Sequence, residues 1–395
     1  MGARITREGL AFAAVASLAA TPAQLGLLEA LVRGPAIVVG LAGGGFVDRR
    51  PKRPILIGAD LGRALVLATL PAAALLHRLA MGQIYLVAAT VGALGVLFDI
   101  ADHAYLPRLI GRARLVDGNA KLAATEGLAE IGGPALYGVL FQLLTAPLAI
   151  AVNAATYLFS AAALATIRTR EERPAPEARA RTHPVADVRA GQAVVLANPS
   201  LATLLAVVTA QALFGAIFSA LYVFYALRVL HLGAAMLGAT VAVGGVAAMA
   251  GAAAAGPLIH RVGIGPAFVG CALAAGVGGV FIPLAHGAPI VGMALLMAAQ
   301  LIGDSFGTVA EIAGRSLRQG LTPTALLGRV GGVFAVAPAT AAIAGALAGG
   351  WLGGAIGPRA ALYVAVAGVV LAVAIGLVSP LARMRVMTPP ADTED

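Results

Sequence analysis

Long apolar stretches separated by short polar segments dominate this chain. Twelve of them, at roughly 17–25 residues, are long enough to cross the hydrocarbon core of a bilayer as helices. None shows the alternation of apolar and polar residues that a β-barrel strand requires, so we predict helices throughout. The predicted helices cover 5–21, 24–46, 55–76, 82–104, 117–144, 147–167, 200–226, 234–259, 265–285, 289–313, 328–352 and 359–380.

The chain also repeats itself at about half its length. Segment 44–53 reads GGFVDRRPKR, which places one acid and four cations between two apolar stretches. A weaker copy follows about 212 residues later, and a second pair of segments, 114–118 and 325–329, recurs at nearly the same distance. The matched positions of the first pair are Gly44 and Gly256, Arg49 and Arg261, Pro54 and Pro266, and Gly58 and Gly270. Duplicated halves are typical of secondary transporters, so the repeat predicts transport across a membrane.

Polar segments divide the chain into predicted parts. We expect a first six-helix half over 1–167, a cytoplasmic linker over 168–199, a second half over 200–384 and a disordered tail over 385–395. Two interpretations of the later part of the linker stay open: a short helix on the membrane surface, or a solvated segment. The first helix is short and includes charged residues, which predicts that it is truncated and that translation starts upstream of Met1.

Composition agrees with a membrane protein. Hydrophobic residues make up 60% of the chain and charged residues 11%, against about 25% charged in soluble domains. The single cysteine, Cys271, and six scattered histidines have no metal-ligand spacing, so no metal or other cofactor is predicted. Phosphate-loop and hydrolase motifs are missing, which predicts neither an enzyme nor ATP-driven transport.

The distribution of cations predicts the orientation. Sixteen Lys and Arg residues lie in the connections after the even-numbered helices, and three (Arg78, Arg228 and Arg359) lie near the opposite ends. Positive loops stay in the cytoplasm, so both termini are predicted to be cytoplasmic and nucleic-acid binding is not expected. The alanine- and arginine-rich composition suggests a bacterial inner membrane.

Four segments resemble a known family. Segment 44–53 resembles the loop 2–3 signature of the major facilitator superfamily, and three others resemble its macrolide-efflux and enterobactin-exporter branch. These are 98–107 (FDIA, then LP), 132–138 (GGPALYG) and 316–329 (SLRQ, then LLGR). The resemblance implies an all-α integral membrane protein of twelve transmembrane helices in two pseudo-symmetric six-helix bundles. It also implies a monomeric drug:proton antiporter for multidrug efflux. His260, Ile100 and Asp102 depart from the family pattern.

The loop signature predicts a cytoplasmic gate. Asp48 is expected to accept hydrogen bonds from a helix N-terminus in the other half, where the helix dipole favours an anion. The four cations of the segment are expected to reach the carboxylates of Asp99 or Asp102; they are Arg49, Arg50, Lys52 and Arg53. The alternative, that these cations only set topology, explains most of them but not Asp48.

Charges within predicted helices are candidates for proton coupling, because an ionisable group in lipid is costly and usually functional. Glu126 and Glu130 are four residues apart and share a helix face, where mutual repulsion would keep at least one protonated. Asp304 lies deep in its helix, with Glu311 two turns further along the same face. The alternative for all four is a structural ion pair.

A further set of residues is expected to line a substrate cavity or to shape the helices. The cavity candidates are Glu29, Arg33, Gln211, Phe218, Tyr222 and Gln300. A self-neutralising Glu29–Arg33 pair and aromatic side chains that only pack are the alternatives. Structural roles are predicted for Gly44, Gly133, Pro134, Gly328 and Arg329, and for Asp60 with Arg63.

The leading functional prediction is therefore proton-coupled efflux of amphipathic small molecules by alternating access. A siderophore or metabolite exporter, or an importer of the same fold, is the second possibility. A membrane sensor that does not transport is the third.

Overall fold

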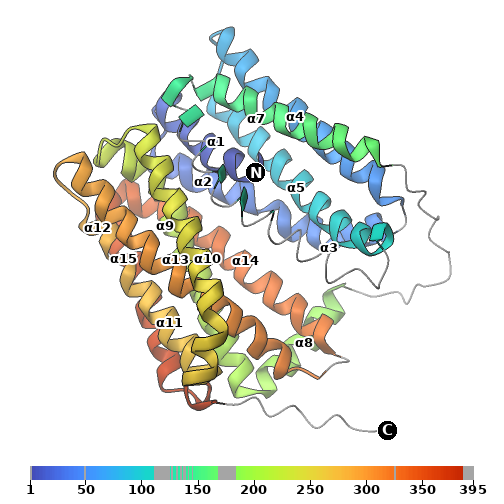
Figure 1. The fold of residues 1–395 in the computed structure, drawn as a ribbon, viewed down its shortest axis with the longest axis vertical. Helices are drawn as coiled ribbons and strands as arrows, with labels where there is room; N and C mark the ends of the chain where they lie inside the picture. Colours follow the sequence, from blue (N-terminus) through green and yellow to red (C-terminus); the bar gives the residue numbers. More distant parts are fainter. Residues whose placement is uncertain are drawn as a thin grey trace. The chain divides into compact units, whose positions relative to one another are not determined.

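The computed structural model describes residues 2–48, 50–110, 146–167, 184–323 and 326–385, with single residues between 125 and 144. Every regular element in these ranges is helical, which confirms the predicted fold class (Figure 1). The α-helices are α1 (Gly2–Leu18), α2 (Pro22–Arg33), α3 (Pro35–Asp48), α4 (Lys52–Leu75), α5 (Met81–Ile110), α7 (Ala146–Thr166), α8 (Pro184–Ala197), α9 (Pro199–Phe224), α10 (Ala234–Val262), α11 (Ile264–Gly278), α12 (Phe281–Leu284), α13 (Pro289–Gly320), α14 (Leu327–Ala355) and α15 (Pro358–Leu377). A π-helical turn, η2 (Tyr225–Val229), and a 3-10 turn, η4 (Pro380–Arg383), complete the set.

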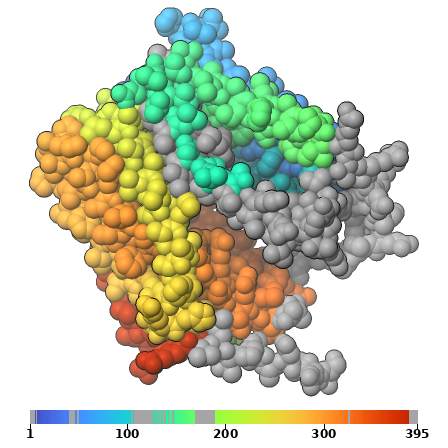
Figure 2. Space-filling model, viewed as in Figure 1, coloured from blue at the N-terminus to red at the C-terminus, as the bar shows by residue number. Residues whose placement is uncertain are grey.

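Ten helices in the described part of the chain are long and apolar enough to cross a membrane, and Glu8–Leu18 forms a shorter apolar helix. Large apolar side chains are exposed on many of them, including Val246 and Met249 of α10, which lies on the face seen in Figure 2. Such exposure is expected for helices that contact lipid. The protein is therefore a multi-pass membrane protein. The predicted helix 117–144 lies mostly outside the described residues.

Three predicted helices are interrupted in the structure, and one of them, 265–285, forms α11 and α12 on either side of Gly279 and Val280. The stretch 24–46 forms α2 and α3, which meet at Gly34, because Pro35 has no backbone N–H to continue the hydrogen-bond ladder. The stretch 200–226 ends in η2, where the Leu230 N–H donates to the Tyr225 carbonyl at 3.0 Å. A five-residue turn of this kind widens the helix locally.

The described helices form two compact units. Unit 1 comprises Met1–Arg179 and Tyr222–Ala242. In this unit α4 packs against α5 and α7, and α1 packs against α7. The Arg228 guanidinium donates to the Val15 carbonyl of α1 at 2.8 Å, which ties the turn after α9 to this unit.

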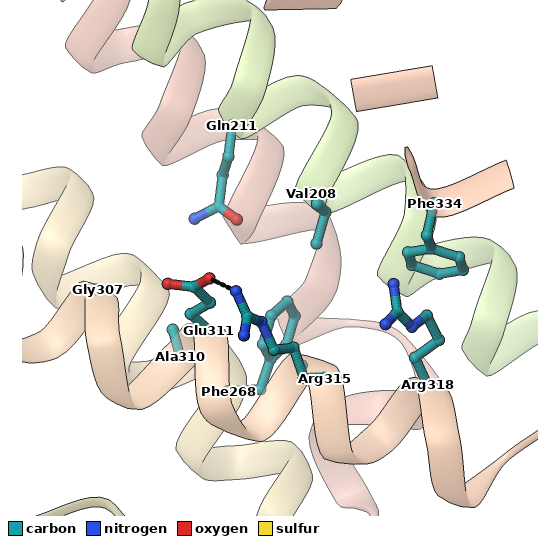
Figure 3. Close-up of a pocket in the computed structure, with 10 residues that line it drawn as sticks. Val208, Gln211, Phe268, Gly307, Ala310, Glu311, Arg315, Arg318 and Phe334 are labelled. Atoms are coloured by element: carbon teal, nitrogen blue, oxygen red, sulfur yellow. Dashed lines mark hydrogen bonds and ion pairs between the residues drawn. The ribbon is translucent and has the colours of Figure 1, made fainter. Parts of the chain in front are cut away.

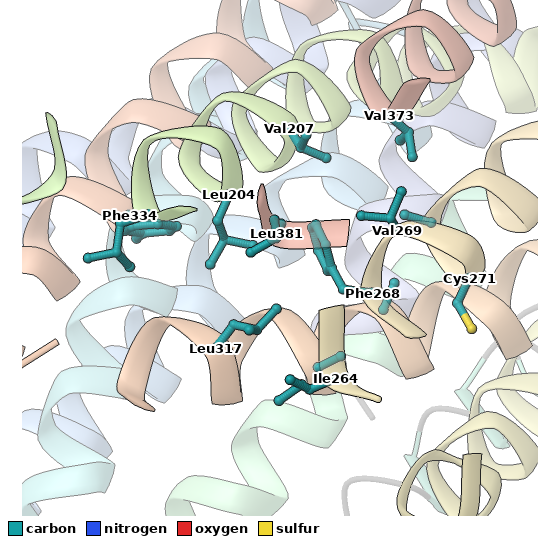
Figure 4. Packing of buried hydrophobic residues seen from close by; sticks show 14 of the residues in the cluster. Leu204, Val207, Ile264, Phe268, Val269, Cys271, Leu317, Phe334, Val373 and Leu381 are labelled. Carbon is teal, nitrogen blue, oxygen red and sulfur yellow. The ribbon is translucent and has the colours of Figure 1, made fainter. Parts of the chain in front are cut away.

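Unit 2 comprises Ala180–Leu221 and Val243–Asp395. Its helix α11 packs against α13, α15 and η4 around a buried apolar cluster that includes Phe268 and Leu317 (Figure 4). A Cβ at Gly345 of α14 would overlap the Leu213 carbonyl of α9, so glycine allows these two backbones to approach closely. Small residues at helix contacts are a common feature of membrane proteins.

The later part of the predicted linker forms a helix, but this helix packs against another helix, which neither alternative from the sequence described. Helix α8 packs against α14, and Val195 is fully buried in the core of unit 2. At Gly191 a side chain would meet the Arg329 carbonyl, so α8 and the start of α14 lie backbone to backbone. The end of the linker is thus part of unit 2.

Candidate functional site

A cavity of about 340 Å³ opens in unit 2 beside the second half of α13. We call it the α13 pocket (Figure 3). Apolar residues and glycines form much of its wall, and a few polar side chains point into it, as is usual for small-molecule sites. Its lining residues are Val208 and Gln211 of α9, Phe268 of α11, Gly307, Ala310, Glu311, Gly314, Arg315 and Arg318 of α13, and Phe334 of α14.

The spacing of polar residues on α13 explains why they gather here. Gln300, Asp304, Glu311, Arg315 and Arg318 follow one another at intervals of three, four or seven residues, so they lie along one face of the helix. The two predicted residues Gln211 and Glu311 meet at the pocket from different helices. Gln211 was predicted to line a substrate cavity and Glu311 to take part in proton coupling.

The charges of the pocket are unevenly paired. The Arg315 guanidinium contacts the Glu311 carboxylate at 2.5 Å, and both side chains are well exposed. The Arg318 guanidinium lies 5.5 Å from the centre of the Phe334 ring, in the geometry of a cation–π contact. Arg318 has no acidic partner within the described ranges.

Asp304 and Gln300 lie one to two turns away from the pocket and face α10. A Cβ at Gly244 would overlap Asp304 Oδ2 and lie 2.9 Å from Gln300 Nε2, so both polar groups reach the bare backbone of α10. The hydroxyl of Ser305, next to Asp304 on α13, donates to the Ala247 carbonyl of α10 at 3.0 Å. The structure therefore brings two more predicted residues together at one α10–α13 contact.

Unit 1 contains a buried group of polar residues, the Asp60 cluster, which consists of Asp60 and Arg63 with Thr6, Asn153, Tyr157 and Ser160. The Arg63 guanidinium contacts Asp60 Oδ1 at 2.5 Å, and the two side chains are 6% and 1% exposed. Arg63 is also stacked between two aromatic rings, at 4.5 Å from Phe98 and 4.6 Å from Tyr157. Asp60 Oδ2 and Arg63 Nε have no hydrogen-bond partner in the described part of unit 1.

Comparison with known proteins decides the family. The family model described as Major Facilitator Superfamily matches residues 9–337, which is most of the chain. The chain belongs to the Major Facilitator Superfamily. It is thus a transporter by family, as the repeat and the loop signature predicted. The finer prediction, the macrolide-efflux and enterobactin-exporter branch, goes beyond this match.

Solved structures share the superfamily fold at low identity. The nucleoside transporter NupG is 12% identical, with a TM-score of 0.74 over 95% of this chain and 96% of that one. A bacterial homologue of the iron transporter ferroportin, in an inward-facing state, is 16% identical (TM-score 0.66, 95% and 96% covered). A bacterial homologue of the human lysosomal transporter Spinster is 11% identical (TM-score 0.70, 97% and 94% covered). No curated protein matches the chain.

The superfamily loop between α3 and α4 has a local structure that the sequence did not reveal. Lys52 is 1% exposed, and its ammonium donates to the Val47 carbonyl and, at 2.9 Å, to the Arg50 carbonyl. Arg53 donates to the Leu164 and Ala165 carbonyls of α7, at 3.0 and 2.6 Å. Both cations therefore satisfy backbone carbonyls near helix ends. Arg49 and the side chain of Asp48 lie outside the described residues, and Gly44 is described only as part of helix α3.

The remaining predicted residues fall into four groups. Arg33 pairs with Glu29 at 2.7 Å, as the structural alternative requires. The Tyr222 hydroxyl donates to Thr240 at 3.1 Å, and Phe218 lies against Gly279, so neither lines the α13 pocket. The structure places Asp99 and Asp102 on α5, Gly133 at a buried helical position, and Gly328 and Arg329 at the start of α14. Glu126, Glu130 and Pro134 lie outside the described residues.

Sequence reasoning missed several lining residues of the pocket. Arg315 could have been found, because it lies four residues after Glu311 and opposite charges at that spacing pair on a helix. Arg318 could also have been found, because it lies three residues after Arg315 on the same helix face. Phe268 and Phe334 could not, because their proximity depends on how α11, α13 and α14 pack.

Proposed function

We propose that this transporter is a secondary active exporter that carries amphipathic small molecules out of the cytoplasm in exchange for protons, by alternating access. The α13 pocket is the observation that carries this proposal. Its volume falls in the usual range for ligand sites, and its lining combines apolar side chains with the Gln211 amide, the Glu311 carboxylate and the Arg318 guanidinium. A solute with an apolar body and one or two polar groups fits such a wall.

The position of the pocket supports export. Helix α13 has 32 residues, which is more than the roughly 20 needed to span a bilayer, and the pocket residues Glu311–Arg318 lie in its last third. The cation distribution puts that end of α13 on the cytoplasmic side of an inner membrane. A solute would then meet the pocket from the cytoplasm.

The proton route is assigned to Asp304. It is partly buried in a membrane-spanning helix and held against α10, where a change of charge would alter the contact between two helices. Glu311 is the second carboxylate on this face, but it is paired with Arg315 and exposed. Glu126 and Glu130 stay proposed partners in the other half, and Asp48, Arg49, Arg53, Asp99 and Asp102 stay the proposed gate.

The test begins with a panel of antibiotics and siderophores, applied to an efflux-deficient bacterial host that expresses the chain. We expect lowered susceptibility to at least one amphipathic compound. In proteoliposomes, uphill transport of that compound should follow an imposed pH gradient. Asp304→Asn should abolish the uphill transport and leave downhill exchange intact. The amide has the shape of the acid but cannot bind and release a proton near neutral pH. Full pH-driven accumulation in Asp304→Asn would remove Asp304 from the coupling site.

A further inference from the structure

We infer that the α13 pocket selects amphipathic solutes that carry a negative charge, and that Arg318 recognises that charge. The inference rests on the pocket of the proposed function and names the class of substrate. It depends on three features of the pocket: which charges are already paired, where the unpaired guanidinium lies, and what surrounds it.

The carboxylate of the pocket, that of Glu311, is already paired with a cation. Glu311 is in contact with Arg315 at 2.5 Å, so a cationic solute would have to displace a guanidinium from its carboxylate. An anionic solute displaces nothing, because Arg318 has no acidic partner in the parts of the chain that are described. The pocket as a whole carries two guanidinium groups and one carboxylate, which leaves one positive charge.

The Arg318 side chain contacts an aromatic ring, and no hydrogen bond from its guanidinium is found among the described residues. The guanidinium lies 5.5 Å from the centre of the Phe334 ring, at the edge of the pocket (Figure 3). A guanidinium offers five N–H donors in a fixed planar arrangement, which matches the two oxygens of a carboxylate or phosphate. The contact with Phe334 is made through the face of an aromatic ring, which accepts no N–H bond in the usual sense, so the N–H donors can serve a ligand.

Unit 2 as a whole is positively charged, like the pocket. Over the whole of unit 2 the sequence has nine arginines and six acids, a net charge of +3, and eight of the arginines have described side chains, as do two of the acids, Asp304 and Glu311. The summed field of such a unit attracts anions to its openings. The eight described arginines are Arg189, Arg261, Arg315, Arg318, Arg329, Arg359, Arg383 and Arg385.

The apolar part of the solute would contact Val208, Phe268 and Phe334, which line the pocket on three other helices. Of these, Phe334 lies against the guanidinium of Arg318. An aromatic ring bearing an acid group therefore places its charge at Arg318 and its ring on the apolar wall. Gln211, on the far side of the pocket in Figure 3, can bond a second polar group of the solute.

Three ligands of one shape and different charge test the inference on the purified full chain. Naphthalene-2-carboxylate, naphthalene-2-methanol and 2-naphthylmethylammonium share the ring system, and their binding can be followed by calorimetry. We expect the carboxylate to bind about tenfold or more tightly than the alcohol, since charge-assisted hydrogen bonds are the stronger ones, and the ammonium to bind most weakly. Equal affinities, or tightest binding of the ammonium, would overturn the inference.

Variants locate the charge recognition. Arg318→Gln should remove most of the preference for the carboxylate and leave binding of the alcohol unchanged, while Arg318→Lys should keep part of the preference. The matched control is Arg261→Gln, which removes an exposed cation of the same unit outside the pocket and should change neither affinity. Equal losses in Arg318→Gln and Arg261→Gln would mean that only the general field acts, and would refute the role of Arg318.

A soluble acid and the headgroup of an anionic lipid share this chemistry. Nanodiscs of phosphatidylcholine, with and without phosphatidylglycerol, separate the two sources. Unchanged carboxylate affinity in both assigns the pocket to a soluble acid, and weaker affinity with phosphatidylglycerol assigns it to the lipid headgroup. Ligand affinities are measured at equilibrium and do not depend on transport. The preference for the carboxylate could therefore be refuted while the protein still exports a neutral solute. Conversely, a lack of proton coupling would leave the measured affinities unchanged.

Discussion

Replacing Asp60 by asparagine is expected to lower the free energy of unfolding by about 3–5 kcal/mol, the usual cost of removing one partner from a buried ion pair. Arg63 would keep its charge at 6% side-chain exposure, with the Phe98 and Tyr157 rings as its remaining contacts. Its Nε already lacks a partner in the described part of unit 1, so the surroundings offer little compensation. Denaturation of the purified protein in detergent measures the effect.

Two controls separate burial from the loss of a charge. The double variant Asp60→Asn with Arg63→Met removes both charges, and it should recover most of the lost stability, because an apolar side chain of similar size then fills the site. Glu311→Gln breaks an exposed pair on α13 and should cost less than about 1 kcal/mol. If Asp60→Asn were no more costly than Glu311→Gln, the Asp60 cluster would not be a structural tie.

Two glycines on one face of α10 are expected to respond differently to the same substitution. At Gly251 a Cβ would overlap the Ser305 carbonyl oxygen, so Gly251→Ala must push two helix backbones apart and should cost about 1–3 kcal/mol. At Gly244 the Cβ would meet only the side-chain ends of Asp304 and Gln300, which can move. Gly244→Ala should therefore fold normally and displace the Asp304 carboxylate.

The consequence of Gly244→Ala is a loss of function without a loss of stability. If Asp304 carries the proton, its displacement should reduce pH-driven transport by about tenfold or more, as small misplacements of functional groups do. Thermal unfolding of both glycine variants measures their stability, and pH-driven transport in proteoliposomes measures their function. Normal pH-driven transport in Gly244→Ala would show that the contact of Asp304 with α10 is irrelevant to coupling.

The helices of the described part could be predicted because they coincide with long apolar stretches of the sequence. The breaks inside the helices depend on single residues rather than on the apolar pattern. Pro35 follows Gly34 and interrupts the predicted helix 24–46. The polar face of α13 could likewise be predicted, since Asp304 and Glu311 lie two turns apart on it.

The pocket itself could not be predicted, because its lining comes from four helices that are distant in sequence. Charge alone also did not reveal where Arg53 donates on α7: the structure places its guanidinium on the carbonyls of Leu164 and Ala165. These contacts depend on the packing of α4 against α7, which joins segments about 110 residues apart in sequence.

Filling the α13 pocket tests the central claim, that solute binds there, most directly. Gly307 lines the pocket, and the nearest atom to a Cβ at this position is the Ala275 Cβ at 4.0 Å, so a larger side chain has room to enter the cavity. Gly270 is the matched control, because it is exposed on α11 and a Cβ there would meet nothing within 4 Å. Transport of the compound found in the susceptibility panel would be measured in proteoliposomes at equal protein level. The account predicts that Gly307→Phe abolishes transport in both uphill and exchange modes while Gly270→Phe transports normally. Wild-type transport by Gly307→Phe would contradict it.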